Sequence, residues 1–173
     1  MEIRFASTRD IPGIIDLLQQ VGQVHHEIRP DLFRSGAQKY DEAALEKLLA
    51  DPKRPILAAV IDGKLAGYAF CILQITENDP VLCDRKVLYI DDLCVDEALR
   101  GNGIAGALYR RVCAYAKEIG CDAVTLNVWC GNDGAMGFYE KCGLKPQKIG
   151  MEYILQEIPC RGGSLTLPKP SPN

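Results

Sequence analysis

The sequence predicts an α/β protein with a mixed central sheet of six to seven strands and about four flanking helices. Two observations lead to this fold class. The early apolar segments 56–61 and 65–75 are joined by a short turn around Gly63, which is typical of an antiparallel hairpin. The later segments 87–95 and 123–129 are joined by a helical pattern, which favours a parallel β-α-β unit. The sheet is therefore expected to be antiparallel in its N-terminal part and parallel in its centre.

The N-terminal part of the chain predicts one strand and two helices. A first strand is expected at residues 2–6. Ser7 and Asp10 have the spacing of a capping box, and apolar residues follow helical spacing from there to about residue 22. Asp41 opens the second helix. Residues 25–40 lack a regular pattern, so no element is predicted there.

The C-terminal half predicts two more helices and a last strand or strand pair. The helices span about 104–119 and 132–141, and the strand or strand pair spans 144–158. Four prolines and two glycines follow, a composition typical of a flexible segment. Residues 1–158 are therefore expected to form one domain, with residues 159–173 as a Pro/Gly-rich C-terminal tail. A contact with a second copy would order such a tail, so a homodimer is an open expectation.

Composition excludes several classes of protein. The chain has 173 residues and a net charge of −3, whereas a nucleic-acid-binding domain is more often basic. No apolar run approaches the roughly 18 residues that span a membrane, and the start of the chain predicts a strand in place of a signal peptide. We therefore expect a cytoplasmic protein that binds neither nucleic acid nor membrane.

Cysteine and histidine spacing predicts no metal site. None of the eight cysteines forms a C-x-x-C pair, and several lie in apolar runs, as Cys71 does. Free thiols packed as small apolar side chains are the favoured interpretation, ahead of a catalytic nucleophile. His25 and His26 are adjacent, so on a helix they point about 100° apart and cannot chelate one ion. A solvated helix end is favoured for them over the lining of a substrate pocket.

A glycine-rich loop from Arg100 to Ala105 lies between a predicted strand and a predicted helix. Glycines let the backbone approach an anion, and successive N–H groups can converge on phosphate oxygens. The helix start near Ile104 adds its positive end, and Arg100 adds a formal charge. The loop therefore predicts a pyrophosphate-binding site. The alternative is a turn whose glycines serve steric needs alone.

The spacing Gly101-x-Gly103-x-x-Gly106 also matches the dinucleotide-binding pattern. That pattern normally follows the first strand of a parallel sheet, with an acidic residue about 20 positions later at the end of the next strand. Here the loop follows a hairpin, and Asp122 precedes the next strand. A nucleotide-binding oxidoreductase is thus the weakest of the alternatives.

With its flanks, the loop resembles the Arg/Gln-x-x-Gly-x-Gly/Ala signature of the GNAT superfamily of N-acetyltransferases. The preceding segment, 88–95, is similar to the fourth strand of that family. Downstream, Asn132-x-x-Ala-x-x-Phe-Tyr-Glu-Lys-x-Gly-Leu144 resembles its second signature, although Leu144 stands where the family usually has Phe. The resemblance covers roughly residues 1–158. It implies acetyl-CoA as the acyl donor, no metal, and two central parallel strands that splay apart at their C-terminal ends.

The resemblance also implies which residues contact acetyl-CoA. The main chain at the end of the fourth strand would bind the pantetheine arm, and the glycine loop would bind the pyrophosphate. Asn132 would cap its helix or touch the pantetheine. The implied cofactor-binding residues are Leu93, Cys94, Val95, Arg100, Gly101, Asn102, Gly103, Ile104, Ala105 and Asn132.

Tyr139 and Asp91 are the catalytic residues that the resemblance implies. A phenol has a pKa near that of a thiol, so Tyr139 is a competent general acid for the leaving thiolate. Asp91 would accept the proton of the amine through water and attract a cationic substrate. Strand alternation would place Asp92 on the opposite face in a structural role. The alternatives are a packing role for Tyr139 and a structural hydrogen bond for Asp91.

The expected activity is direct transfer of acetyl from acetyl-CoA to a primary amine in a ternary complex. The acceptor is a small amine, a polyamine or a peptide amine, and the acidic pair on the strand leans towards a cationic amine. The alternative from another class is a non-catalytic domain that binds or senses CoA.

Overall fold

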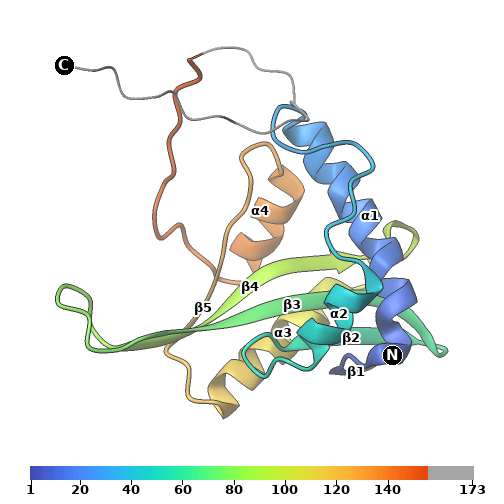
Figure 1. Cartoon of the computed structure of the whole chain (residues 1–173), viewed down its shortest axis with the longest axis horizontal. Coiled ribbons are helices and arrows are strands. Elements are labelled where there is room, and N and C mark those ends of the chain that lie inside the picture. The colour runs from blue at the N-terminus through green and yellow to red at the C-terminus, as the bar shows by residue number, and fades with distance from the viewer. Residues whose placement is uncertain (156–173) are drawn as a thin grey trace, which may run out of the picture.

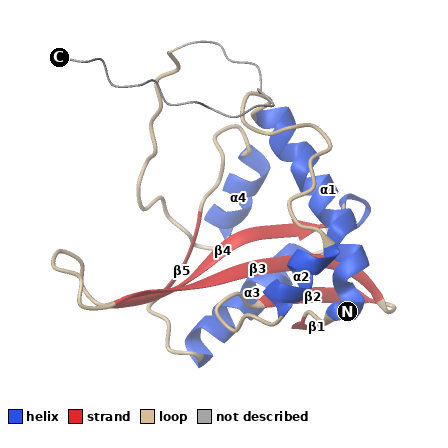
Figure 2. Ribbon diagram, in the orientation of Figure 1, coloured by secondary structure: helices blue, strands red, loops and turns tan. Residues whose placement is uncertain are grey.

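A computed structural model describes residues 1–155 and contains one five-stranded sheet with helices on both faces (Figure 1; Figure 2). The strands are β1 (Glu2–Phe5), β2 (Ile56–Ile61), β3 (Lys64–Thr76), β4 (Arg85–Val95) and β5 (Ala123–Leu126). The helices are α1 (Ile11–Ile28), α2 (Glu42–Leu49), α3 (Ile104–Glu118) and α4 (Asp133–Lys141), with short 3-10 turns at Thr8–Asp10 and Glu97–Leu99. No helix among residues 1–155 combines the length and the hydropathy of a membrane-spanning segment.

The sheet has the predicted mixed topology. Its strands lie in the order β1-β2-β3-β4-β5, and the first four pair antiparallel. β4 and β5 pair parallel across the crossover helix α3. A dinucleotide-binding sheet would be mainly parallel, so this topology removes the support for that alternative.

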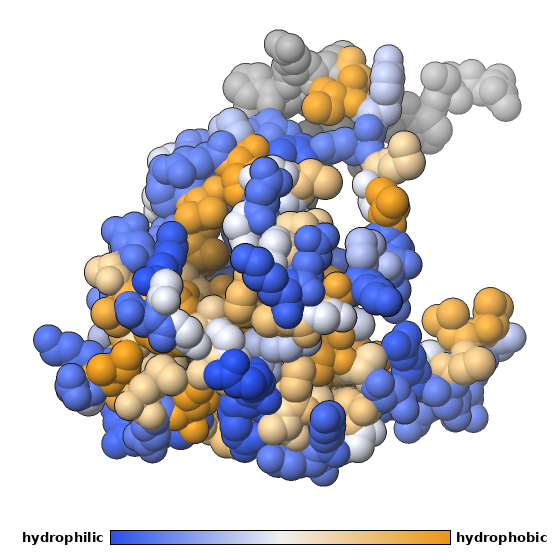
Figure 3. All heavy atoms as spheres, turned by 180° about the vertical axis from the view of Figure 1, so that it is seen from behind, coloured by the Kyte–Doolittle hydropathy of each residue, from blue (hydrophilic) through white to orange (hydrophobic). Residues whose placement is uncertain are grey.

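The predicted strand count is wrong for the described residues. Residues 144–155 contain no strand, and residues 156–158 lie outside the described residues, as does the predicted tail 159–173. Apolar residues stabilise a strand only when one face of it is buried. Here they are on the surface (Figure 3), and Met151 and Tyr153 are 93% and 86% exposed. An apolar pattern without a surface to cover is insufficient to form the strand.

Two apolar clusters hold the helices to the sheet. α1 and α2 cover one face, where Leu18 and Leu45 pack with Tyr68 of β3 (Figure 1). α3 covers the other face, where Leu108 and Val112 pack against the centre of the sheet. α4 lies beside α3, with aromatic contacts between the two helices. The sheet is thus buried on both faces, and α4 lies near the C-terminal ends of β4 and β5.

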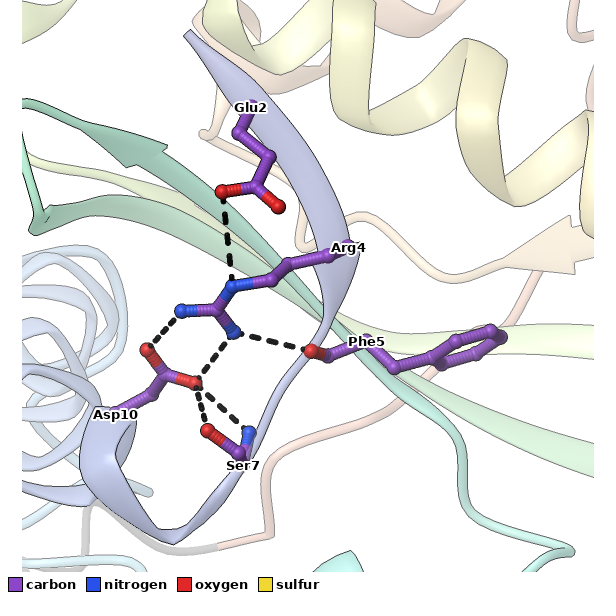
Figure 4. Close-up of polar contacts among 5 residues, drawn as sticks. All are labelled: Glu2, Arg4, Phe5, Ser7 and Asp10. Carbon is purple, nitrogen blue, oxygen red and sulfur yellow. Dashed lines mark hydrogen bonds and ion pairs between the residues drawn. The ribbon is translucent and has the colours of Figure 1, made fainter.

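A partly buried ion pair fixes the start of α1 to β1 (Figure 4). Arg4 donates two hydrogen bonds, of 2.7 and 2.8 Å, to the carboxylate of Asp10. The backbone N–H of Ser7 donates to the same carboxylate at 2.7 Å, as the predicted capping pattern requires. The bonds from Arg4 lower the pKa of Asp10 to about 2. α1 then runs to Ile28, about six residues beyond its predicted end, and carries His25 and His26 in its last turn.

Candidate active site

A cavity of about 530 Å³ lies where β4 and β5 end. Side chains from α1, β4, β5, α4 and the segment 29–41 surround it. Its polar and aromatic lining comprises His25, Phe33, Arg34, Gln38, Lys39, Tyr89, Asp91, Asp92, Asn127, Trp129, Asn132 and Tyr139. The cavity therefore contains both predicted catalytic residues, Asp91 and Tyr139, together with groups that the sequence did not single out.

β4 and β5 separate beside this cavity. Their parallel pairing runs from Val87 opposite Ala123 to Ile90 opposite Leu126, where β5 ends. β4 continues to Val95 and, within residues 1–155, its last residues pair with β3 alone. Among the described residues, the edge of β4 that faces β5 thus has no strand partner over the predicted main-chain contacts Leu93, Cys94 and Val95. An extended amide chain could add to this edge as a strand does.

A β-bulge interrupts β4 at the two aspartates. Phe70 of β3 lies opposite Asp92, while the next residue, Cys71, lies opposite Ile90, so Asp91 has no partner in the register. A bulge breaks the alternation of side chains along a strand. Both Asp91 and Asp92 consequently line the cavity. The expectation that they point to opposite faces is corrected.

The two carboxylates have different partners. Nζ of Lys39 lies 3.0 Å from Oδ2 of Asp91, in a partly exposed ion pair. Oδ2 of Asp92 accepts a 3.0 Å hydrogen bond from the hydroxyl of Tyr68, which is itself fully buried. Burial raises the pKa of Asp92 above its ordinary value, against the opposing effects of Lys39 and Tyr68. Partial burial lowers the pKa of Lys39, but the hydrogen bond to Asp91 and the nearby carboxylates outweigh it and raise the pKa overall.

Tyr139 projects from α4 into the same cavity. Burial raises the pKa of its phenol, and the charge of Asp92 raises it further, so the hydroxyl stays protonated at neutral pH. Its ring packs edge-on against Phe138, with centroids 4.9 Å apart. Asn132 caps α4, because its Oδ1 accepts a 3.1 Å bond from the N–H of Ala135, as the sequence predicts. The start of α4 is thereby held at the cavity wall.

The glycine loop has the backbone geometry of an anion-binding turn. Gly101 and Gly103 have φ values of +83° and +77°, and Gly103 is the N-cap of α3. A Cβ at either glycine would meet no atom within 4 Å, so space is open in front of the loop. The first N–H groups of α3, which include those of Ile104 and Ala105, have no partner within the helix and carry its positive end. These donors suit a pyrophosphate.

The side chains of the loop bond to the chain around it. Arg100 Nε donates to the carbonyl of Val95 at 3.2 Å, and Asn102 Nδ2 donates to the carbonyl of Leu99 at 3.0 Å. These bonds connect the loop to the end of β4. The predicted cofactor residues thus form two adjoining groups, the open strand edge and the loop after it.

The sequence predicted no element between residues 29 and 40, which make up nearly all of the segment 29–41 that forms one wall of the cavity. Phe33 anchors this segment, since its ring lies 5.0 Å from the His25 ring and 5.3 Å from the Trp129 ring between centroids. Arg29 lies 5.9 Å above the ring of Trp129. These aromatic contacts cross between segments far apart in the sequence, so periodicity could not reveal them. The one hint in the sequence was His25, for which the lining of a substrate pocket was the alternative interpretation. The favoured interpretation, a solvated helix end, is wrong for His25, because it is half-buried and lines the cavity.

Known proteins are similar to this chain in sequence. Residues 21–144 match the acetyltransferase (GNAT) family. An uncharacterised N-acetyltransferase of Mycobacterium tuberculosis is 34% identical over 103 residues, which are 60% of this chain and 60% of that protein. The chain therefore covers less than two thirds of that relative.

Solved structures show the same fold. A mutant of the BH1408 protein from Bacillus halodurans superposes with a TM-score of 0.87 at 34% identity, over 90% of this chain and 100% of that chain. The aminoglycoside N-acetyltransferase AAC(6')-Iy, solved in complex with CoA, superposes with a TM-score of 0.68 at 15% identity, over 90% of this chain and 99% of that one. The second likeness shows the fold alone. With the family match over residues 21–144, these findings establish that the chain belongs to the acetyltransferase (GNAT) family.

Proposed function

We propose that the protein transfers the acetyl group of acetyl-CoA directly to a primary amine while both substrates are bound. The observation that carries the proposal is the open edge of β4, which runs from the glycine loop to the cavity with Tyr139 and Asp91. The amine class comprises small amines, polyamines and peptide amines.

Two groups of main-chain donors and acceptors would hold acetyl-CoA. The loop from Arg100 to Ala105, with the start of α3, would bind the pyrophosphate. The main chain of residues 93–95 would pair with the amides of the pantetheine arm. Asn132 lines the cavity next to this path and could contact the same arm. The thioester would then lie near the separation of β4 and β5, beside Tyr139.

Tyr139 is the proposed general acid. The bond from the thioester carbon to sulfur breaks as the amine attacks, and the sulfur leaves as a thiolate that needs a proton. The partly buried phenol of Tyr139 is protonated and can supply it. No covalent bond to the protein is required in this scheme.

Asp91 is the proposed acidic group for a cationic acceptor. Its carboxylate already binds one ammonium group, that of Lys39, at the cavity wall. A substrate ammonium that displaces Lys39, or approaches beside it, would be attracted in the same way and could release its proton through water. The pairing with Lys39 supports a role in recognition of positive charge.

The catalytic unit in this proposal is a single domain of residues 1–158, with residues 159–173 as a tail. The described residues contribute the loop, the open edge and the cavity without a second domain.

Thiol release from acetyl-CoA across a panel of amines tests the proposal. The panel would include a small primary amine, spermidine, a peptide with a free N-terminal amine and an N-blocked lysine peptide. At least one class should accelerate release and yield an acetylated product by mass spectrometry. If acetyl-CoA binds tightly and no amine accelerates release, the protein is instead a non-catalytic CoA-binding domain.

A further inference from the structure

His25 lines the cavity from α1, and Asp91 and Asp92 line it from β4. It is half-buried in the last turn of α1, and its ring packs against Phe33 at 5.0 Å between centroids. A ring nitrogen of its neighbour, Nδ1 of His26, lies 2.7 Å from the carbonyl oxygen of Phe33. The helix and the segment 29–41 therefore hold the imidazole of His25 in place, facing the cavity.

Asp92 is the carboxylate whose charge acts on His25. It lines the same cavity, and the hydroxyl of the buried Tyr68 fixes its orientation at 3.0 Å. Its charge also acts on Tyr139, so Asp92 influences two groups of the cavity lining, His25 and Tyr139. Among residues 1–155, Asp92 forms no ion pair within 4.0 Å, whereas Asp91 is engaged by Lys39. Asp92 thus has no direct ion-pair partner among these residues, and its ionised form, which burial disfavours and which Lys39 and Tyr68 favour, can stabilise a new positive charge.

We infer that His25 takes the proton that the acceptor ammonium must lose, and that Asp92 positions and stabilises the resulting imidazolium. This inference rests on the proposed function and adds two residues to it, one catalytic and one positioning. In this scheme Asp91 attracts the ammonium, and the proton goes to a ring nitrogen of His25, directly or through one water.

The proton and electron balance is complete with these groups. The amine nitrogen forms a bond to the acetyl carbon, and the bond from that carbon to sulfur breaks. One proton moves from the ammonium to His25, and one moves from Tyr139 to the sulfur. As the tetrahedral intermediate collapses, its nitrogen gives its second proton to the Tyr139 phenolate, and after product release His25 releases its proton to solvent. The sum is an acetylated amine, free CoA thiol and one proton.

Burial above all favours the neutral form of His25 before the reaction. Burial lowers the pKa of its imidazole, Lys39 lowers it further, and Asp92 partly offsets both. The other titratable groups that line the cavity are Arg34, Tyr89, Asp91 and Tyr139. A neutral imidazole can accept a proton, so activity should be lost as pH falls through the pKa of His25, below its ordinary value of 6.5.

Two variants test this inference, with His26→Gln as the matched control. His25→Gln should lower kcat by about 100-fold and remove the acidic limb of the pH profile, while acetyl-CoA affinity stays within about twofold. His26→Gln, in which an amide can replace the bond to the Phe33 carbonyl, should keep that limb and most of the rate. A wild-type rate and pH profile in His25→Gln would overturn the inference.

NMR titration of His25 provides a second readout that needs no amine. In Asp92→Asn the favourable charge is lost, so the pKa of His25 should fall relative to the wild type. An unchanged His25 pKa in a folded Asp92→Asn protein would exclude the pairing. Failure of every amine in the panel would contradict the proposed function, yet would leave this titration result unaffected, so the two failures are distinguishable.

Discussion

Lys39 and Asp91 meet at the cavity wall, with 3.0 Å between Nζ and Oδ2, although 52 positions separate them in the sequence. This ion pair places an ammonium group of the protein on the carboxylate proposed to attract the substrate. It also joins the segment 29–41 to β4. In the proposed function, the acceptor site is thus occupied by the protein's own positive charge, which a cationic substrate would have to share or replace.

Removing that charge should improve the binding of cationic amines. Lys39→Gln frees Asp91, so KM for a cationic acceptor should fall by about threefold to tenfold, in keeping with the modest energy of a partly exposed ion pair. Steady-state kinetics at two salt concentrations would measure this, and Asp91→Asn should raise KM instead. Lys47→Gln, on the exposed face of α2, is the control and should leave KM unchanged at both salt concentrations. A higher KM in Lys39→Gln would show that Lys39 itself contacts the acceptor.

Tyr139→Phe should lower kcat by about 100-fold, because the leaving thiolate loses its proton donor. Acetyl-CoA affinity, measured by calorimetry, should be unchanged. Tyr115→Phe is the control, since Tyr115 packs against Phe5 outside the cavity lining. An unchanged rate in Tyr139→Phe would remove this residue from the acid role.

Gly103→Val should abolish detectable acetyl-CoA binding. The φ of +77° disfavours any side chain, and a branched one would also occupy the open space before the loop. Gly63→Val is a matched control, because its φ of +76° and open surroundings impose similar strain, about 1–2 kcal/mol, in a distant hairpin turn. Calorimetry should detect normal binding in Gly63→Val. Normal binding in Gly103→Val would mean that the pyrophosphate lies elsewhere.

Asp10→Asn should destabilise the fold by about 2–3 kcal/mol at pH 7, because it leaves Arg4 partly buried without its partner. The pKa of Asp10 is lowered from 3.8 to about 2 in the folded protein. The stabilisation is therefore fully present above pH 4 and is lost as pH falls through 2. Urea unfolding at pH 7, 4 and 2.5 would measure the free energy of unfolding of both proteins. The difference between Asp10→Asn and the wild type should become smaller only at pH 2.5. Asp16→Asn, exposed on the same helix, should have little effect at any of them.

Local patterns predicted most of the elements correctly, because each depends on neighbours in the chain. The turn at Gly63 and the caps Asp41 and Asn132 are decided by a few residues. The last predicted strand was wrong within the described residues, because a strand depends on contacts with distant parts of the chain. Whether an apolar pattern such as 144–155 becomes a strand depends on a distant edge and a surface to cover.

The sequence by itself determined the order of elements, the glycine loop and the family signatures that indicate an acetyltransferase. Only the tertiary structure decided which charges meet in the cavity. A bulge directs both Asp91 and Asp92 into the cavity, and this bulge depends on the register between β3 and β4. His25 and Lys39 line the same cavity as these aspartates because α1 and the segment 29–41 pack across from β4. Electrostatic interactions depend on the distance between charges in space, and the separation of two residues along the sequence does not predict that distance.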